Sequence, residues 1–204
     1  KIAQDLHDNV GSTLSSISIY SQVAQMQSDE NDKRELNDIL GKISLTSTDM
    51  ISEMNDIVWA INPRNDSMER MIQRMESFAK PLLAAKDIRF TFNYDPAILA
   101  AALEMEKRKN FYLIFKEAIN NSIKYSGATM VKVDIGMKNR KLELTVKDNG
   151  KGFDTAKLKT GQSQSLSGNG LRNMKMRAAE MKGEIRIESK PGEGTSVSLI
   201  SSIP

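Results

Sequence analysis

A predicted strand, residues 141–147, runs directly into the stretch Asp148-Asn149-Gly150-Lys151-Gly152-Phe153. Glycines let a backbone approach a flat ligand closely, and a carboxylate at the end of a strand can accept a hydrogen bond from an exocyclic amine. Taken alone, Asp-Asn-Gly is also a common turn sequence. The stretch therefore indicates a ligand site only if other parts of the chain supply complementary groups.

A second candidate lies on a predicted helix, residues 106–125, that contains Glu117-Ala118-Ile119-Asn120-Asn121-Ser122-Ile123-Lys124-Tyr125. Glu117, Asn121 and Lys124 occupy positions i, i+4 and i+7, so they share one helical face opposite the apolar one. An acid, an amide oxygen and an ammonium group on one stripe can hold a hydrated Mg²⁺ ion and a polyphosphate. Taken alone, this stripe is more commonly a solvated helix face.

A third candidate, Gly168-Asn169-Gly170-Leu171, leads into a predicted helix at residues 171–181. Glycine-rich backbone at a helix N-terminus offers amide donors and a positive dipole end to phosphate. Residues 148–170 contain few apolar side chains, and so long a segment without periodicity is usually a functional lid. Three such sites in this order, with a lid between the last two, arise by chance much less often than any one of them alone.

The rest of residues 64–204 predicts an α+β sandwich with helices on one face of a mostly antiparallel sheet. A capping box, Asp66 with Glu69, starts a helix over residues 68–85 that contains Pro81. Gly183 stops the helix that begins at residue 171. The predicted strands are residues 88–94, 130–137, 141–147, 184–189 and 195–201, with a loop or short helical turn at residues 95–102.

Residues 2–27 and a run ending at Ile61 predict two long helices joined by a polar turn at residues 28–32. Their apolar residues follow the alternating three-and-four spacing of a heptad seam. The seam positions are Ala3, Leu6, Val10, Thr13, Ile17, Tyr20 and Ala24 in the first helix, and Leu36, Leu40, Ile43, Ser47, Met50, Met54, Ile57 and Ile61 in the second. We expect two such hairpins to form a dimeric four-helix bundle. A monomeric hairpin packed on its own second domain is the alternative. Pro63 ends the hairpin, which places the domain boundary between residues 63 and 64.

His7, the only histidine of the chain, lies one residue past Leu6 and is followed by Asp8. On the shoulder of the seam, an imidazole can be held by the helix and still reach solvent. A lone histidine is more often structural than chemical. Whether His7 has a chemical role therefore depends on whether the three candidate stretches downstream form a site that can use a histidine.

Composition limits the classes of function. The 29 basic and 26 acidic residues are interspersed and give a net charge of +3, so no basic block favours a nucleic-acid partner. The absence of cysteine from the sequence excludes disulfides and thiolate metal sites. No apolar run approaches the ~20 residues of a membrane span. Because the chain begins at Lys1-Ile2-Ala3 without methionine, we expect it to be a fragment of a longer protein.

These motifs resemble a known superfamily. The three candidate stretches resemble the N box, the first glycine box and the second glycine box of the ATP-binding domain shared by histidine kinases, Hsp90, MutL and gyrase (the Bergerat or GHKL fold). Gly192-x-Gly194-Thr195 resembles its terminal strand signature. Residues 1–63 resemble the dimerisation and histidine phosphotransfer hairpin of sensor histidine kinases, in the subfamily whose H box reads Leu-His-Asp. The resemblance implies an ATP-dependent protein-histidine kinase of a bacterial two-component signal transduction system.

The resemblance also implies roles for individual residues. His7 would be the phosphoacceptor, and Asp8 would orient its imidazole and accept its proton. Glu117 would orient a water or metal ligand, Asn121 would bind Mg²⁺, and Lys124 would contact a phosphate of ATP.

The remaining nucleotide contacts come from the glycine boxes. Asp148 would take the adenine amino group, with Gly150 and Gly152 making room for the ring and Thr195 closing that end. Gly168 and Gly170 would let the lid fold over the phosphates. The other positions assigned to nucleotide binding are Tyr125 and Leu171.

Two positions depart from the subfamily pattern. A glutamine often follows the histidine by five residues and positions water for dephosphorylation of the partner; Ser12 stands there, which puts phosphatase activity in doubt. Tyr125 stands where histidine is common, and an aromatic ring can still stack or pack there.

The resemblance implies a homodimer that passes phosphate to an aspartate in the receiver domain of a response regulator. Residues 64–204 would be the catalytic ATP-binding domain, and the chain would be the cytoplasmic part of a membrane-bound sensor. A degenerate scaffold that binds ATP but signals by conformation is one alternative, against which the intact His7, Asp8 and Asn121 argue. Another is a serine kinase or chaperone-like ATPase of the same superfamily, but these lack an H box.

Overall fold

The computed structural model describes residues 2–28, 33–62, 66–155 and 168–203. The chain divides into two compact units, Lys1–Trp59 and Ala60–Pro204. The division falls within the last turn of the second helix, and the functional domains of residues 1–63 and 64–204 stay a prediction. Among the helices of the described ranges, none combines the length and hydropathy that a membrane span requires.

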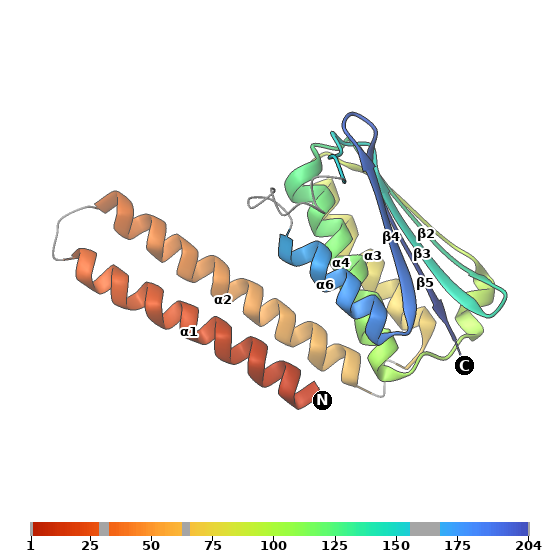
Figure 1. The fold of residues 1–204 in the computed structure, drawn as a ribbon, viewed down its shortest axis with the longest axis horizontal. Helices are drawn as coiled ribbons and strands as arrows, with labels where there is room; N and C mark the ends of the chain where they lie inside the picture. The colour runs from red at the N-terminus through yellow and green to blue at the C-terminus, as the bar shows by residue number, and fades with distance from the viewer. Residues whose placement is uncertain (1, 29–32, 63–65, 156–167, 204) are drawn as a thin grey trace. The chain divides into compact units, whose positions relative to one another are not determined.

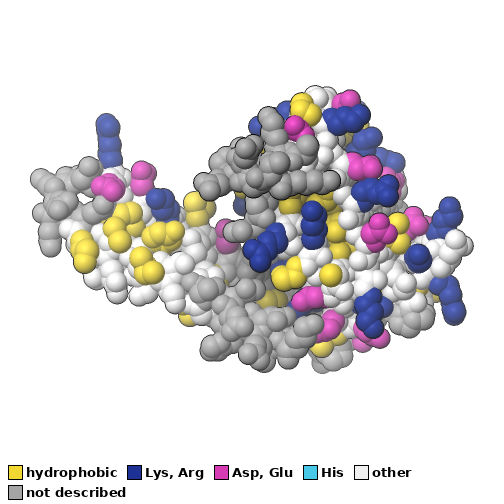
Figure 2. All heavy atoms as spheres, in the orientation of Figure 1, with side chains coloured by type: hydrophobic (Ala, Val, Ile, Leu, Met, Phe, Trp, Pro, Cys, Tyr) yellow, Lys and Arg dark blue, Asp and Glu magenta, His cyan; other side chains and the backbone are white. Residues whose placement is uncertain are grey.

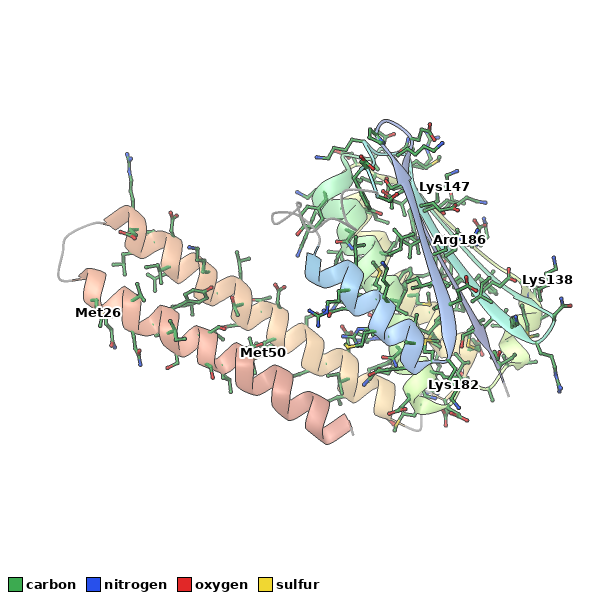
Figure 3. The ribbon with its side chains drawn as sticks, in the orientation of Figure 1. Met26, Met50, Lys138, Lys147, Lys182 and Arg186 are labelled. Atoms are coloured by element: carbon green, nitrogen blue, oxygen red, sulfur yellow. The ribbon has the colours of Figure 1, made fainter. Side chains whose placement is uncertain are left out.

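The first unit is the predicted helical hairpin, formed by α1 (Ile2–Ser28) and α2 (Lys33–Ile61), which lie side by side (Figure 1). Burial along the seams is partial. Ala24 and Ile39 are buried, whereas Leu40 and Met54 of the predicted seam are exposed. Further exposed apolar side chains are Leu14, Ile19, Val23 and Met26 on α1, and Leu45, Ile51 and Val58 on α2. Figure 2 shows apolar side chains along this hairpin, and Figure 3 shows Met26 projecting from α1.

The second unit is built on a five-stranded sheet in the order β1-β2-β3-β5-β4. β1 pairs with β2 in parallel, and the other neighbours are antiparallel. The strands are β1 (Arg89–Tyr94), β2 (Met130–Lys138), β3 (Lys141–Asp148), β4 (Gly183–Lys190) and β5 (Gly194–Ser202). The mostly antiparallel sheet confirms the prediction.

Helices cover one face of this sheet (Figure 1). Phe111, Phe115 and Ile119 of α4 are fully buried, as are Val133 and Leu144 on the sheet. Lys147 and Arg186 project from the opposite face, which is exposed (Figure 3). The helical elements are α3 (Met68–Ala84), η2 (Pro96–Ala100), α4 (Met105–Asn121), η3 (Ser122–Ser126) and α6 (Gly168–Glu180). The α+β class predicted from the sequence is therefore confirmed.

The start of α3 differs from the prediction. Its cap is Ser67, whose hydroxyl accepts from Arg70 N at 3.3 Å, so the capping box of Asp66 with Glu69 was wrong. Asp66 instead forms an ion pair with Arg108 of α4. The Arg108 side chain is almost completely buried, and this burial lowers its pKa. The ion pair ties the first residues of the unit to the start of the helix that carries the N box.

The end of α6 differs as well. Lys182, with φ of 53°, is the left-handed residue after the helix, while Gly183 already begins β4. A Cβ on Gly183 would lie 2.8 Å from the carbonyl oxygen of Ile200. Gly183 is thus required by the close approach of β5, and its predicted role as the helix stop was wrong.

Candidate functional site

The helix that carries the N box changes its winding at the motif. We predicted a regular helix to Tyr125, but α4 ends at Asn121 and continues as the π-helical turn η3. Ser126 Oγ donates to Ser122 O at 2.5 Å. Ser122 Oγ lies 3.1 Å from Ala118 O, one of two acceptors within its reach, so both hydroxyls can compete for helical carbonyls. Single π turns inside α-helices are frequent at functional sites.

The wider turn changes where the predicted stripe points. Glu117 and Asn121 remain one α-helical turn apart, and Asn121 Nδ2 donates to Glu117 Oε1 at 3.3 Å. Lys124 lies in the π turn, is exposed, and is outside the lining of the pocket described below. The structure therefore brings two of the three stripe residues together, and the phosphate contact of Lys124 stays a prediction.

The first glycine box is held as a rigid loop at the end of β3. Asp148 Oδ1 accepts from Gly150 N at 2.9 Å. The side chain of Asn149 accepts from Thr129 N at 3.0 Å and from Met130 N at 2.9 Å, and donates to Thr129 Oγ1 at 2.9 Å. Asn149 thus anchors the loop to β2, a role that the sequence analysis did not assign.

Glycines in this loop allow close backbone packing. A Cβ on Gly150 would overlap the backbone of Ser126, and Lys151 N donates to Ser126 O at 2.8 Å. Gly152 has φ of 56°, and a Cβ there would overlap the carbonyl oxygen of Lys190. The predicted need for glycine therefore has a specific cause here, because the loop is wedged between η3 and the β4–β5 turn.

Two further serines join the parts of the site. Ser122 Oγ lies 3.2 Å from Asp148 Oδ2, which links the N box to the glycine box. Ser189 Oγ accepts from Phe153 N at 2.8 Å and lies 3.1 Å from Thr195 Oγ1. Thr195 is itself paired with Asp148 in the sheet register. Segments far apart in the sequence are thereby connected around one carboxylate.

These segments enclose a pocket with about 510 Å³ of empty space, part of it open to solvent. Asp148 lies in the wall with a relative exposure of 5 %, so its carboxylate is a polar group in a mainly apolar lining. The lining residues are Ala118, Asn121, Ser122, Tyr125, Ser126, Val146, Asp148, Gly152, Phe153, Leu171, Thr195 and Val197.

Six of the predicted site residues line this pocket: Asn121, Tyr125, Asp148, Gly152, Leu171 and Thr195. The sequence analysis missed the lining residues Ser122, Ser126 and Phe153. It also missed the apolar wall formed by Val146 and Val197, which the inward positions of the alternating strands would have indicated.

The other end of the site is formed by α6. A Cβ on Gly170 would overlap the Glu117 carboxylate and lie 3.7 Å from Asn121 Nδ2. The predicted glycine therefore lets the first turn of α6 approach both side chains. Gly168 begins α6, and only its backbone is described.

Glu117 and Asn121 offer a carboxylate and an amide oxygen at this end of the site. Both are hard oxygen donors, and Mg²⁺ commonly takes only one or two protein ligands while keeping several waters. The donor set fits such an ion. Among the described residues, no cluster of three or more acidic or histidine side chains offers a more complete metal site.

His7 and Asp8 lie within α1. Their side chains, like that of Ser12, are outside the described part of the structure.

Both units match known families. Residues 106–203 match the family of histidine kinase-, DNA gyrase B- and HSP90-like ATPases, and residues 1–66 match a histidine kinase family. The sensor histidine kinase LiaS of Bacillus subtilis is 29% identical over 206 residues, covering 98% of this chain and 52% of that protein. The sensor histidine kinase LnrJ of the same organism is 27% identical over 199 residues, covering 97% and 46%. The chain thus spans about half the length of these curated relatives.

Solved structures share the fold. The histidine kinase AdeS of Acinetobacter baumannii aligns with a TM-score of 0.61 at 14% identity, covering 97% of this chain and 98% of that one. Full-length ShkA in complex with AMPPNP aligns with a TM-score of 0.62 at 14% identity, covering 97% and 46%. With a family match on each unit and sensor kinases aligned along nearly its whole length, the chain belongs to the sensor histidine kinases of two-component systems and carries their GHKL-type ATPase domain.

Proposed function

We propose that this chain transfers the γ-phosphoryl group of ATP to His7 and then to an aspartate in the receiver domain of a response regulator. The observation that carries the proposal is the pocket around Asp148, since its single buried carboxylate, apolar walls and close-packed glycine loop suit a flat base with an exocyclic amine. The full-length ShkA structure, which aligns with this chain, contains the ATP analogue AMPPNP.

Within the pocket, Asp148 accepts a hydrogen bond from the adenine amino group. Gly150 and Gly152 keep the backbone close enough for the ring to lie flat, and Thr195 closes that end. Tyr125 and Leu171 pack against the nucleotide. Each of these contacts positions the base and leaves the phosphates directed toward the α6 end of the site.

At the α6 end, Asn121 binds Mg²⁺ and Glu117 orients a water or ligand of the ion. The bound ion supplies charge neutralisation for the polyphosphate. Lys124 contacts a phosphate from the π turn once the nucleotide is bound. Gly168 and Gly170 allow the first turn of α6 to follow the phosphates. Most of the predicted lid, residues 156–167, lies outside the described residues.

In the hairpin, His7 is the nucleophile. Asp8 orients the imidazole and takes the proton from one ring nitrogen, so that the other nitrogen attacks the γ-phosphorus in line. The phosphorus–nitrogen bond forms as the bond to the ADP oxygen breaks. The exposed apolar side chains of α1 and α2 support a homodimer, in which the faces of two hairpins cover one another. We place the chain in the cytoplasmic part of a membrane-bound bacterial sensor, on the basis of its sensor kinase relatives.

Incubation with γ-labelled ATP and Mg²⁺ tests the proposal. We expect acid-labile, alkali-stable label on the wild-type chain and none on a His7→Gln variant that still binds ATP. Label that persists on His7→Gln would contradict the assignment of the phosphoacceptor. Binding of ATP without any labelled wild-type protein would favour a scaffold that signals by conformation.

A further inference from the structure

Ser122 is a buried pocket residue to which the roles above assign nothing. Its relative exposure is 4 %, and its Oγ lies 3.2 Å from Asp148 Oδ2 and 3.1 Å from Ala118 O. A hydroxyl has one proton, so it donates to one of these acceptors at a time. The carboxylate is the stronger acceptor, because a hydrogen bond to a charged group is roughly twice as strong as a neutral one.

The Asp148 carboxylate is fixed by two donors of the protein. Gly150 N donates to Oδ1 at 2.9 Å, and the Ser122 hydroxyl faces Oδ2. An ionised carboxylate has about four acceptor positions, so these donors set its plane and leave positions for a ligand. Without the hydroxyl, only the Gly150 contact would hold the carboxylate, and its plane would be free to rotate.

The π turn holds Ser122 in place. Ser126 Oγ donates to Ser122 O at 2.5 Å, and Ser126 O accepts from Lys151 N at 2.8 Å. The hydroxyl is therefore carried on a segment that is itself bonded to the loop after Asp148. Ser122 and Asp148 are connected both directly and through the backbone of η3.

We propose that Ser122 is a positioning residue for base selection: by donating to Asp148 Oδ2 it holds the carboxylate in the orientation that accepts from the adenine amino group. This inference rests on the proposed function, because it requires a nucleotide base in the pocket. A base with a keto oxygen at that position would place this hydrogen-bond acceptor against the Asp148 carboxylate, which is also an acceptor. The pocket would therefore exclude such a base. The contribution of Ser122 is thus a preference for the amino group and not general affinity for nucleotides.

The test compares ATP with purine riboside triphosphate, which lacks the exocyclic amino group. Equilibrium binding of both to the whole chain with Mg²⁺ is measured by titration calorimetry for wild type, Ser122→Ala and Ser122→Thr. Loss of one hydrogen bond typically corresponds to about a 2- to 13-fold change in affinity. We expect Ser122→Ala to bind ATP about 5-fold more weakly and the analogue about as tightly as wild type, whereas Ser122→Thr keeps the wild-type preference.

A control and a second variant separate positioning from packing. Ser201 is a buried serine that donates to Met181 O at 3.1 Å and lies outside the pocket lining, so Ser201→Ala should change neither affinity. Ser122→Cys keeps the side-chain shape but is a weak donor, and should behave like Ser122→Ala.

Two results would overturn the inference. If the Ser122 variants lose affinity for both nucleotides equally, the residue only packs, and the proposed function stands without it. If wild type binds neither nucleotide, the proposed function fails and the inference fails with it.

Discussion

The two units of the chain differ in how completely each covers its own apolar side chains. In the α+β unit, Phe111 and Phe115 have no exposed surface. In the hairpin, Ile19, Leu45 and Ile51 are exposed by 59, 69 and 61%. Full burial of such a side chain contributes ~1.5–3 kcal/mol, so the hairpin forgoes a large part of its possible stabilisation. The difference indicates that the α+β unit is complete as a fold, whereas the hairpin requires another apolar surface.

The two units also differ in how many parts of the chain support the proposed functional residues. In the α+β unit, the carboxylate of Asp148 is held by contacts from η3 and the glycine loop, and Asp148 is paired with Thr195 of β5 in the sheet register. In the hairpin, the proposed chemistry depends on His7 and its neighbour Asp8. Substitutions in the pocket should therefore have graded effects, and those in the hairpin should abolish assembly or transfer.

The largest effect is expected when the apolar stripe of α2 is disrupted. Ile51 and Val58 are two turns apart on one face and are exposed by 61 and 58%. Replacing both by lysine should raise the dissociation constant of the proposed dimer by at least about 100-fold, or ~3 kcal/mol, in sedimentation equilibrium. Asp49→Lys places a lysine on the opposite face of α2 and should leave the dimer intact. A double variant that dimerises like wild type would show that this stripe is not the interface.

A smaller effect is expected at the pocket carboxylate. Asp148→Asn removes the charge and places an amide nitrogen near the donors Gly150 N and Ser122 Oγ. Because hydrogen bonds to charged groups are worth ~1.5–3 kcal/mol, the dissociation constant for ATP should rise roughly 10- to 100-fold while dimerisation is unchanged. Titration calorimetry checks this, with Glu184→Gln on the exposed face of β4 as a control. Unchanged affinity would remove Asp148 from the site.

Two glycines with positive φ test how tightly the α+β unit is packed. Gly152, with φ of 56°, would direct a Cβ into the carbonyl oxygen of Lys190, while Gly192, with φ of 84°, has open space around it. Gly192→Ala should cost only the backbone strain of ~1–2 kcal/mol, and Gly152→Ala about 2 kcal/mol more. The free energies of unfolding in urea measure both. Equal losses would mean that the loop yields easily and the unit is less rigid than described.

The residue at position 12 tests whether one side chain of the hairpin decides between phosphorylation and dephosphorylation of the regulator. Because glutamine is absent from this position, we expect the chain to stimulate dephosphorylation of the proposed response-regulator partner only weakly. The rate of regulator dephosphorylation is measured with His7→Gln protein and ADP, which removes transfer back to histidine. Rapid dephosphorylation in this assay would refute the prediction.

The smallest effect is expected on the exposed face of the sheet. Burial alone would raise the pKa of Asp134, but hydrogen bonds from Asn93 and Lys132 and the Lys132 charge lower it. A lowered pKa stabilises the fold above the unfolded pKa, and that contribution is lost as pH falls through the folded pKa. Since 42% of the Asp134 side chain is exposed, solvent screening should limit the loss in Asp134→Asn to a few tenths of a kcal/mol at pH 7. Urea unfolding should show a larger difference at pH 7 than near pH 3, because protonation of Asp134 removes the contribution.

Much of the fold followed from periodicity. The helix of residues 106–125 and the strands near residues 130–147 had clear apolar patterns, and their bounds agree with the structure within a few residues. Sequence periodicity did not reveal the π turn after Asn121, since the serine hydroxyls that compete for helical carbonyls look like ordinary polar positions. The cap of α3 was misassigned for a related reason. Asp66 and Ser67 are both good caps, and only the ion pair with Arg108 decides between them.

The site was predictable where a motif demanded a residue type. Asp148, Gly152 and Thr195 were predicted as site residues from the family motifs, and all three line the pocket. The structure adds why position 152 requires glycine, since a Cβ there would overlap the carbonyl oxygen of Lys190. Ser122 was not predictable, because its role depends on the distance to a carboxylate on another element. Contacts across elements are what sequence spacing alone does not contain.

The strand order has a consequence for synthesis of the protein on the ribosome. β5, the last of these five strands to be made, lies between β3 and β4 in the interior of the sheet and supplies Thr195 and Val197 to the pocket. A nascent chain that already contains His7, the N box and both glycine boxes therefore still has a gap in the middle of its sheet. Chains released early, by premature termination or proteolysis, would lack one wall of the pocket. An incomplete copy should thus be unable to form the pocket that we propose for ATP.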